Sequence, residues 1–327
     1  NMPTWYRTNI LNVSIFKVDM GIPPKMANIS DSRFTVIVIP DPQEYSRGRP
    51  DIFLNQTKWI KENIDPLNIK FVIEVGDLVD AGKSTNQWNV ANKSMGVLDG
   101  TVPYLVTVGN HDTMTVDSPT RDDTLYDTYF NYTRFNKYSW FGGYYPPGGA
   151  DDMYGTFSYT NPISSRTPKE DFLVMGLAWC PTDDELIWAD NVISSNPDKK
   201  VILFTHAYLN NKNLRLDYAS FGSCASVGVP GNEGEDIWNK LVSKNQNIIL
   251  VVSGHMFGFG AKVDYVGDYP VNQILQNFQS VLNGGNGWLS VYTFIPEENR
   301  IELRTYSPYL GQYDTAPEHQ FDLTYKD

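Results

Sequence analysis

The first half of the chain alternates short apolar runs with segments of helical periodicity. Residues 34–39 form a β-branched run that ends at a proline, and residues 71–75 and 104–108 form two more. Apolar residues recur near helical spacing over residues 52–64, and a further helix is expected over residues 88–98. The order strand, helix, strand, helix, strand predicts a sheet whose neighbouring strands run parallel.

The second half returns to the same signals after a long irregular stretch. Residues at about 118–170 are rich in Tyr, Gly, Pro and Asp, and a loop of that length is usually functional or poorly ordered. Beyond it, strands are expected at residues 172–178, 200–205, 247–252, 271–278, 288–295 and 300–306, and helices at residues 183–193 and 236–242. We therefore predict one α/β (α+β) domain over residues 33–327 with a mixed two-sheet core, preceded by an N-terminal extension at residues 1–32.

The balance of charges and the length of the apolar runs narrow the classes of function. The 327 residues carry 38 acidic and 26 basic side chains, a net charge of −12. Because nucleic-acid affinity depends on neutralising phosphates, this balance disfavours DNA and RNA as partners. No apolar run approaches the roughly 20 residues that a helix needs to cross a bilayer, so we expect no membrane span.

Several weak signs favour an exported protein. The chain starts at Asn1 rather than Met, which suits a removed signal sequence, and aromatic residues make up 13% of it. N-glycosylation sequons occur five times, against roughly four expected by chance, so they decide nothing by themselves. They lie at Asn12, Asn28, Asn55, Asn92 and Asn131. We expect an extracellular or secreted glycoprotein.

The chain has two cysteines, Cys180 and Cys224, which can form one disulfide but no four-thiolate zinc site. One follows the strand expected at residues 172–178 and the other lies in the loop after His206, so both are expected near one rim. A bridge would close a loop of about 45 residues and would hold the His206 loop. Such a bridge would support an oxidising compartment. The alternative is two buried, unpaired thiols in an intracellular enzyme.

Polar residues suited to metal binding follow five of the predicted strands. They are Asp41, Asp77, Asn110, His206 and His255. Ligands of α/β sheets gather beyond the carboxyl ends of strands, so these five residues are expected to converge. A single aspartate there is commonly a cap or turn residue and a single histidine a core residue, but the combination is uncommon. Carboxylate, amide and imidazole groups together predict a transition-metal site with mixed O and N ligands.

These residues lie in motifs that resemble those of the calcineurin-like metallophosphoesterase superfamily. The motifs are Gly76-Asp77-Leu78-Val79-Asp80, Gly109-Asn110-His111-Asp112, the isolated His206 and Gly254-His255. The resemblance spans about residues 34–308 and implies a four-layer αββα sandwich of two mixed β-sheets. It also implies two metals about 3.5 Å apart. By similarity, Asp77 bridges the metals, Asp41 belongs to one site, and the other is completed by Asn110, His206 and His255.

The chain departs from the family pattern at two positions. Where the family has Asp-x-His the chain has Asp41-Pro42-Gln43, and where the family has Gly-His-x-His it has Gly254-His255-Met256-Phe257. The side-chain carbonyl of Gln43 can ligate a hard cation, whereas Phe257 has no ligand atom. We therefore expect one well-formed site for a divalent transition metal (Zn, Fe or Mn) and a second, weaker site rich in oxygen.

The resemblance implies a metal-dependent phosphoric ester hydrolase that acts on a small phosphoester. A metal-bound hydroxide would attack phosphorus, and His111 would protonate the leaving oxygen as general acid. Asp112 would orient His111 or fix the turn, and Asp80 would support the loop. The alternative is a catalytically weak or inactive phosphoesterase-fold glycoprotein with a binding or structural role, which Phe257 favours. The aromatic insertion would cap the metal rim or serve self-association.

Overall fold

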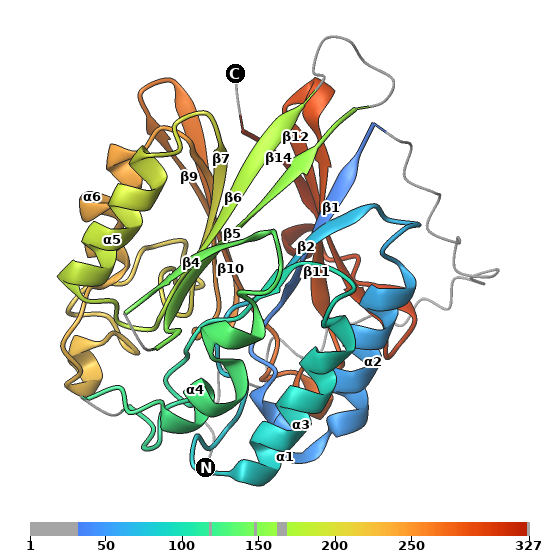
Figure 1. Ribbon diagram of the computed structural model, residues 1–327, viewed down its shortest axis with the longest axis vertical. Coiled ribbons are helices and arrows are strands. Elements are labelled where there is room, and N and C mark those ends of the chain that lie inside the picture. Colours follow the sequence, from blue (N-terminus) through green and yellow to red (C-terminus); the bar gives the residue numbers. More distant parts are fainter. Residues whose placement is uncertain (1–31, 118–119, 147–148, 162–168, 326–327) are drawn as a thin grey trace.

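The computed structural model describes residues 32–117, 120–146, 149–161 and 169–325 (Figure 1). The N-terminal extension expected at residues 1–32 lies outside these ranges except for its last residue, and so do the sequons at Asn12 and Asn28. Within the described ranges, two sheets pack face to face and helices cover their outer faces. This arrangement confirms the four-layer αββα sandwich with two mixed β-sheets.

The first sheet is built around the parallel strands of the N-terminal half. Its strand order is β13 (Gln312–Tyr313), β12 (Arg300–Ser307), β11 (Leu289–Ile295), β1 (Phe34–Ile39), β2 (Ile69–Glu74) and β3 (Tyr104–Leu105), with β14 (Phe321–Thr324) paired to β12. β1, β2 and β3 run parallel, as the alternation of strands and helices predicts, and β11 runs antiparallel to β1. β3 is shorter than the strand expected at residues 104–108, and beyond it the Val108 carbonyl accepts a hydrogen bond from the N–H of Trp179 at 2.9 Å.

The second sheet contains most of the C-terminal half. Its strand order is β4 (Phe141–Tyr145), β5 (Asp152–Tyr159), β6 (Glu170–Leu177), β7 (Lys200–Thr205), β8 (Ile248–Ser253), β10 (Tyr269–Asn277) and β9 (Gly258–Val266). The four strands β6, β7, β8 and β10 run parallel, and the others run antiparallel to their neighbours. The sequence does not predict the edge strand β9, because Gly, Lys and Asp interrupt its apolar pattern.

The insertion at about 118–170 is more regular than its composition suggests. It contains α4 (Thr124–Phe130) and supplies the strands β4 and β5. Glycines in β4 leave room for aromatic packing, because a Cβ on Gly142 would lie 2.1 Å from the ring of Tyr154. Every described aromatic residue of the insertion is buried or half-buried, and the rings of Tyr132 and Tyr144 stack at 3.8 Å. These side chains pack within the domain, so self-association through them stays a prediction.

The main core lies between the two sheets. Phe34 on β1 and Phe172 on β6 are completely buried, and their ring centroids are 5.1 Å apart, so they join one sheet to the other. Phe294 on β11 stacks on Phe34 at 4.7 Å. Aromatic pairs of this kind add to the stability gained by burying apolar area. The core therefore fixes how the strand ends of the two sheets face each other.

Helices cover the outer faces of the sandwich. The first sheet carries α1 (Gln43–Gly48), α2 (Pro50–Glu62) and α3 (Thr85–Met95), and the second carries α5 (Asp183–Ser194) and α6 (Gly234–Lys240), at the left of Figure 1. On α2 the apolar side chains of Ile52, Phe53 and Ile60 are buried against the first sheet. The short helix α7 (Leu282–Gly285) packs against α1. Among the described residues, no helix combines the length and apolar character needed to cross a membrane.

Candidate metal centre

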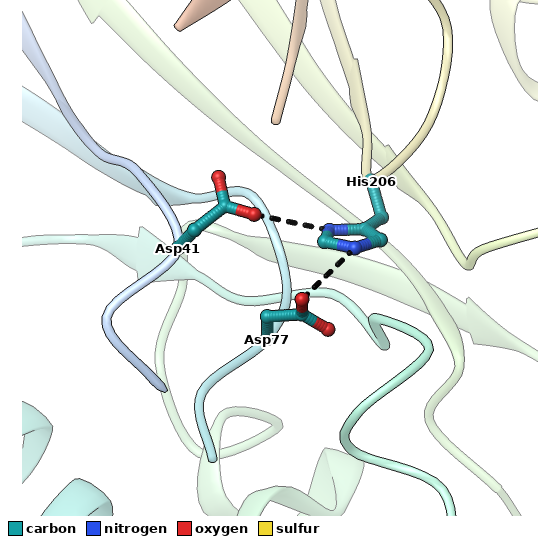
Figure 2. A group of neighbouring side chains, drawn as sticks. All are labelled: Asp41, Asp77 and His206. Carbon is teal, nitrogen blue, oxygen red and sulfur yellow. Dashed lines mark ion pairs between the residues drawn. The ribbon is translucent and has the colours of Figure 1, made fainter. Parts of the chain in front are cut away.

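Loops at the strand ends bring the predicted ligands together at one edge of the two sheets. Asp41 follows β1, Asp77 follows β2, and Asn110 follows the segment beyond β3. His206 and His255 follow β7 and β8. Figure 2 shows the carboxylates of Asp41 and Asp77 pointing toward the ring of His206. One ligand atom from each of these three residues lies within 4.8 Å of the other two, so the centre can hold a metal ion.

The glycines of the motifs allow the ligand loops to touch. A Cβ on Gly109 would lie 2.2 Å from Oδ1 of Asp77, and a Cβ on Gly254 would lie 2.1 Å from Oδ2 of Asp41. Atoms do not approach this closely in a packed interior, so a side chain at either position would displace a carboxylate. Asp77 and His255 adopt positive φ angles of 59° and 65°, a conformation concentrated at functional sites.

Four atoms with lone pairs crowd into the middle of the site. Nε2 of His206 lies 3.0 Å from Oδ1 of Asn110 and 3.3 Å from Oδ2 of Asp77. Nδ1 of His255 lies 3.1 Å from the same oxygen of Asn110. The two imidazole rings meet edge to face, with their centroids 5.0 Å apart. His206 is completely buried, so solvent screens these contacts little.

Backbone carbonyls orient both imidazoles. Nδ1 of His206 lies 2.9 Å from the carbonyl oxygen of Val75, and Nε2 of His255 lies 2.8 Å from the carbonyl oxygen of Gly222. A carbonyl oxygen only accepts, so in each neutral ring the proton belongs on the nitrogen that faces it. The other nitrogen of each ring then presents a lone pair to the centre, as in a histidine that ligates metal.

Asn110 is oriented in the same sense. Its Nδ2 donates to Oδ1 of Asp117 at 2.9 Å, which leaves its own Oδ1 facing the two histidines. With both rings neutral, the centre contains two nitrogens and two oxygens that accept and no group that donates between them. Buried acceptors that face one another are unfavourable unless a cation joins them. This set of nitrogen and oxygen atoms fits a divalent transition metal.

Two further oxygen atoms, on residues that follow β1, lack a hydrogen-bond partner in the described part of the chain. Oδ2 of Asp41 and Oε1 of Gln43 are buried and have no hydrogen-bond partner among the described residues. The other oxygen of Asp41 accepts a hydrogen bond from the N–H of His255 at 2.9 Å. Ligation of a cation would satisfy both orphaned atoms. Phe257, which stands where the family has its second histidine, is 51% exposed and offers no ligand atom.

Mutual charges set the protonation of the metal-free centre. Burial alone would lower the pKa of His206, but attraction to Asp77 and Asp41 raises it to about 9. Burial alone would raise the pKa of Asp77, but His206 lowers it to about 2. Burial raises the pKa of Asp41 to about 8 despite the nearby His206. Burial and the charge of His206 lower the pKa of His255 to about 4. Without metal, protons therefore supply the positive charge that the acceptors require.

His111 lies beside this centre with part of its ring exposed. Its backbone N–H donates to Oδ1 of Asp77 at 3.0 Å, and its Nδ1 lies 2.8 Å from the carbonyl oxygen of Asp80. Burial alone would lower the pKa of His111, but Asp77 and the Asp80 carbonyl raise it. The carboxylate of Asp112 instead accepts three backbone N–H groups of the motif turns, at 2.8, 2.8 and 3.0 Å. The carboxylate of Asp112 thus supports the motif turns and the backbone carbonyl of Asp80 contacts the His111 ring, while the catalytic role expected for Asp112 stays a prediction.

Three features of the site carry little or no signal in the sequence. Glu74, the last residue of β2, is completely buried, and its Oε1 accepts the N–H of Gly76 at 2.9 Å. Burial and the charge of Asp112 hold the pKa of Glu74 well above its usual range. An acidic residue at the end of an apolar strand is the only hint of it. The groups that orient His255 and Asn110, the Gly222 carbonyl and the Asp117 carboxylate, lie in irregular loops that no periodic pattern marks.

Cys180 and Cys224 form a disulfide, with their Cα atoms 5.8 Å apart. Both cysteines are buried in a small apolar cluster with Trp179, Ala207 and other residues of the His206 loop. The bridge therefore lies beside the loop that the sequence analysis expects it to hold. The structure does not contain the alternative, a pair of free thiols.

Three of the five sequons lie within the described residues. Asn55 is exposed on α2, whereas Asn92 and Asn131 are half-buried. The side-chain oxygen of Asn92 accepts a hydrogen bond from Arg134 at 2.6 Å, and that of Asn131 accepts one from the N–H of Thr133 at 3.1 Å. Glycosylation at these positions stays a prediction, and Asn55 is the most accessible of the three.

One curated relative matches most of the chain. The uncharacterized protein YvnB of Bacillus subtilis (strain 168) is 33% identical over 309 residues, which cover 90% of this chain and 21% of that protein. The chain thus spans about a fifth of the length of that relative. The name of that protein assigns no activity. The match therefore indicates common descent, and the chemistry has to be argued from the site itself.

Solved structures share the fold at low identity. The purple acid phosphatase PPD1 from yellow lupin (Lupinus luteus) seeds matches with a TM-score of 0.57 and 14% identity, over 90% of this chain and 54% of that one. GAP50, described as the anchor in the inner membrane complex of Plasmodium, matches with a TM-score of 0.53 and 12% identity, over 90% of both chains. Residues 34–259, which contain every predicted metal ligand, match the calcineurin-like phosphoesterase family. With the motifs and the fold in agreement, the chain belongs to the calcineurin-like phosphoesterase family.

Proposed function

We propose that the chain is a metal-dependent phosphoric ester hydrolase that acts on a small phosphoester. The observation that carries the proposal is the convergence of Asp77, Asn110, His206 and His255, whose nitrogen and oxygen atoms approach to 3.0–3.3 Å in a buried centre. Membership of the calcineurin-like phosphoesterases supports it, because that family hydrolyses phosphoesters at a dinuclear metal site. The acidic net charge of −12 agrees with a small substrate rather than a nucleic acid.

The donor atoms suggest how the residues divide between two metals. Asn110, His206 and His255 hold the better site, for which Zn, Fe or Mn fits the mixed nitrogen and oxygen set. Asp41 and Gln43 would hold a second, weaker site made of oxygens, and Asp77, which lies near both Asp41 and His206, would serve either site. When bound, the metals lower the pKa of the attacking water and neutralise charge on the phosphoryl group.

His111 is the residue proposed to deliver a proton to the leaving oxygen. Its Nδ1 is engaged by the carbonyl of Asp80, so Nε2 is the atom left to exchange a proton with substrate. The carbonyl of Asp80 favours the protonated form of the His111 ring, as a general acid requires. The partial exposure of the ring gives it access to a substrate bound at the centre.

A second candidate is a phosphoesterase fold with weak or no activity and a binding or structural role. The half-exposed Phe257 favours it, since one metal position lacks an imidazole that the family usually has. The fold itself is compatible with such a role, because GAP50, with 12% identity, is described as an anchor. The orphaned oxygens of Asp41 and Gln43 favour the enzyme, because they remain suited to a cation.

We propose in addition that the protein works outside the cytoplasm. The disulfide between Cys180 and Cys224 supports this, because structural disulfides persist in oxidising compartments. Recovery of the protein from culture medium or cell envelope, with no free thiol, is the expected outcome. Recovery from the cytoplasm with both thiols free would contradict it.

One experiment separates the two candidate functions. The purified chain is loaded with Zn²⁺, Mn²⁺ or Fe²⁺, and its metal content is measured together with hydrolysis of 4-nitrophenyl phosphate. Turnover that disappears in Asp77→Asn supports the hydrolase. His319→Ala is the control, because the side-chain contacts of His319, with Asp314, Phe259 and Phe278, include no predicted ligand. One metal or none, with no turnover on a panel of phosphomonoesters and phosphodiesters, supports the second candidate.

A further inference from the structure

The loop between β7 and α6 forms one wall of the metal centre. It leaves β7 at His206 and contains the short pairing of Leu209 with Arg215 before it reaches Cys224. Apart from the Gly222 carbonyl, the described backbone hydrogen bonds of residues 217–223 join residues of the same loop. The position of this stretch therefore depends on the few contacts that tie it to the rest of the domain.

One of those contacts is made to a predicted metal ligand. The carbonyl oxygen of Gly222 lies 2.8 Å from Nε2 of His255. Gly222 has a φ angle of +76°, and a Cβ there would lie 2.8 Å from Sδ of Met256 and 3.1 Å from Nε2 of His255. Only glycine lets the backbone approach the imidazole in this way. The contact holds the proton on Nε2 and leaves Nδ1 for the metal.

The disulfide anchors the same stretch two residues further on. Cys224 is bonded to Cys180, and both residues are at most 2% exposed. Cys180 is held in turn, because the guanidinium of Arg121 donates to its carbonyl at 3.4 Å and to that of Trp179 at 3.1 Å. The N–H of Trp179 donates to the carbonyl of Val108, two residues before Asn110. The bridge thus connects the Asn110 loop to the loop that orients His255.

A second anchor acts beside the disulfide. The N–H groups of Cys224 and Ala225 donate to the carboxylate of Glu233 at 3.2 and 2.9 Å. Glu233 is buried and caps the start of α6. Loss of the disulfide would therefore make the position of the Gly222 carbonyl more variable without freeing the loop. The expected effect on His255 is a partial loss of its orientation.

We propose that the Cys180–Cys224 disulfide is a positioning element of the metal centre, because it holds the Gly222 carbonyl on Nε2 of His255. The bridge thereby sets which ring nitrogen of His255 is available to a metal. The inference rests on the proposed metal site and adds to it a covalent link outside the ligand set. Its effect is on metal affinity first and on turnover only through the metal.

Metal affinity tests the proposal with Co²⁺ as the probe. Groups that orient a ligating histidine typically change metal affinity by about 10–100-fold when they are lost. We expect Cys180→Ala/Cys224→Ala to bind Co²⁺ more weakly than the parent chain by about that factor. In a His255→Ala background, the same pair of substitutions is expected to cause little further loss, since the coupling passes through His255. Equal Co²⁺ affinity of parent and double variant overturns the inference.

A pair of glycines in the same loop tests the carbonyl with the disulfide intact. Gly222→Ala places a methyl group against His255, whereas Gly228→Ala, at the nearly identical φ of +77°, meets nothing within 4 Å. Both variants place a residue with a side chain at nearly the same positive φ. We expect only Gly222→Ala to weaken Co²⁺ binding, and equal affinities in the two variants overturn the inference.

The tautomer of His255 gives a readout independent of metal. The chain has four histidines, so their ¹⁵N signals are few enough to assign. In the metal-free parent we expect His255 to be protonated on Nε2, and in Cys180→Ala/Cys224→Ala to populate both tautomers. A parent chain that binds no Co²⁺ overturns the proposed metal site itself, whereas normal binding with an unchanged tautomer in the variant overturns the positioning role alone.

Discussion

Nε2 of His206 lies 3.3 Å from Oδ2 of Asp77, and both side chains are almost completely buried. In the metal-free protein they form a buried ion pair, because His206 has a raised pKa and Asp77 a lowered one. Removing one member of such a pair leaves an uncompensated charge, which typically costs about 3–5 kcal/mol. We predict that His206→Ala destabilises the metal-free protein by about this amount and also abolishes metal binding at the better site. Denaturant unfolding with a chelator present and metal analysis without one measure the two effects.

The control for this prediction is another histidine with a carboxylate partner. Nδ1 of His319 lies 2.7 Å from Oδ2 of Asp314, and both side chains are about one-fifth exposed. Solvent reaches this pair but not that of His206 and Asp77, so His319→Ala is expected to cost less stability than His206→Ala and no metal. Similar losses of stability in the two variants would show that the environment of His206 is not special.

The protonation of the centre predicts how the metal-free protein responds to pH. Asp41 has a pKa of about 8 when folded, against an ordinary value of 3.8, so the folded state keeps a proton that the unfolded chain releases. Its contribution to stability is complete below about pH 4 and is lost as the pH rises through about 8. The contribution of His206 to stability is complete below its ordinary pKa of 6.5 and is lost as the pH rises through about 9, its pKa in the folded state. Unfolding measured with a chelator present should show stability falling across this window, and a rise would contradict it.

The same protons should be released when metal binds. A metal replaces the protons of Asp41 and His206 because it ligates the atoms that carried them or their neighbours. Titration calorimetry at neutral pH is run in two buffers with different ionisation enthalpies. The apparent binding enthalpies should differ in proportion to the difference between those ionisation enthalpies. Equal enthalpies in the two buffers would mean that the metal-free centre holds no displaceable proton.

The sequence predicts the site residues that stand at strand ends. It does not predict contacts made by the backbone of irregular loops. The apolar run before Asp77 and the one before His206 each end at a polar residue, and parallel strands bring such ends to one edge. Gly222 lies in a loop and acts through its backbone carbonyl. Every residue has such a carbonyl, so nothing in the sequence distinguishes this one. The strand β4 was equally hidden, because its glycines are selected by the neighbouring ring of Tyr154 rather than by strand propensity.

His111→Ala tests the proton donor. We predict that the variant keeps its metals and folds normally, since within the described part of the chain the ring donates only to the Asp80 carbonyl, but loses about 10²–10⁴-fold in turnover. The loss should be larger for an alkyl phosphate than for 4-nitrophenyl phosphate, because a poorer leaving group depends more on protonation. Metal analysis and turnover on the two substrates measure this. A variant that loses metal would show that His111 is a ligand instead.

Asp112→Ala tests whether Asp112 supports the motif turns or acts on His111. Its carboxylate accepts three buried backbone N–H groups, and each donor left without a partner costs about 1–3 kcal/mol. We predict a large loss of stability together with weaker metal binding, because two of those N–H groups belong to Asp77 and Gly109. Thermal or denaturant unfolding measures the first effect and Co²⁺ titration the second. A stable variant with an altered pH profile of turnover would instead indicate that Asp112 acts on His111.

Phe257→His restores the imidazole that the family pattern has and this chain lacks. The ring of Phe257 is 51% exposed, so replacing it removes little packing and should change stability by less than about 0.5 kcal/mol. The orphaned oxygens of Asp41 and Gln43 would provide the other ligands of the proposed weaker site, and a nitrogen ligand suits first-row metals better than water does. We therefore expect more metal bound per chain and faster hydrolysis in Phe257→His, with Phe257→Ala as the matched control that removes the ring without adding a ligand.

Since a better-filled second site should raise turnover only if the reaction needs it, an increase in metal without an increase in rate would assign the chemistry to the first site alone. An unchanged metal content would show that the side chain at position 257 does not reach the metal.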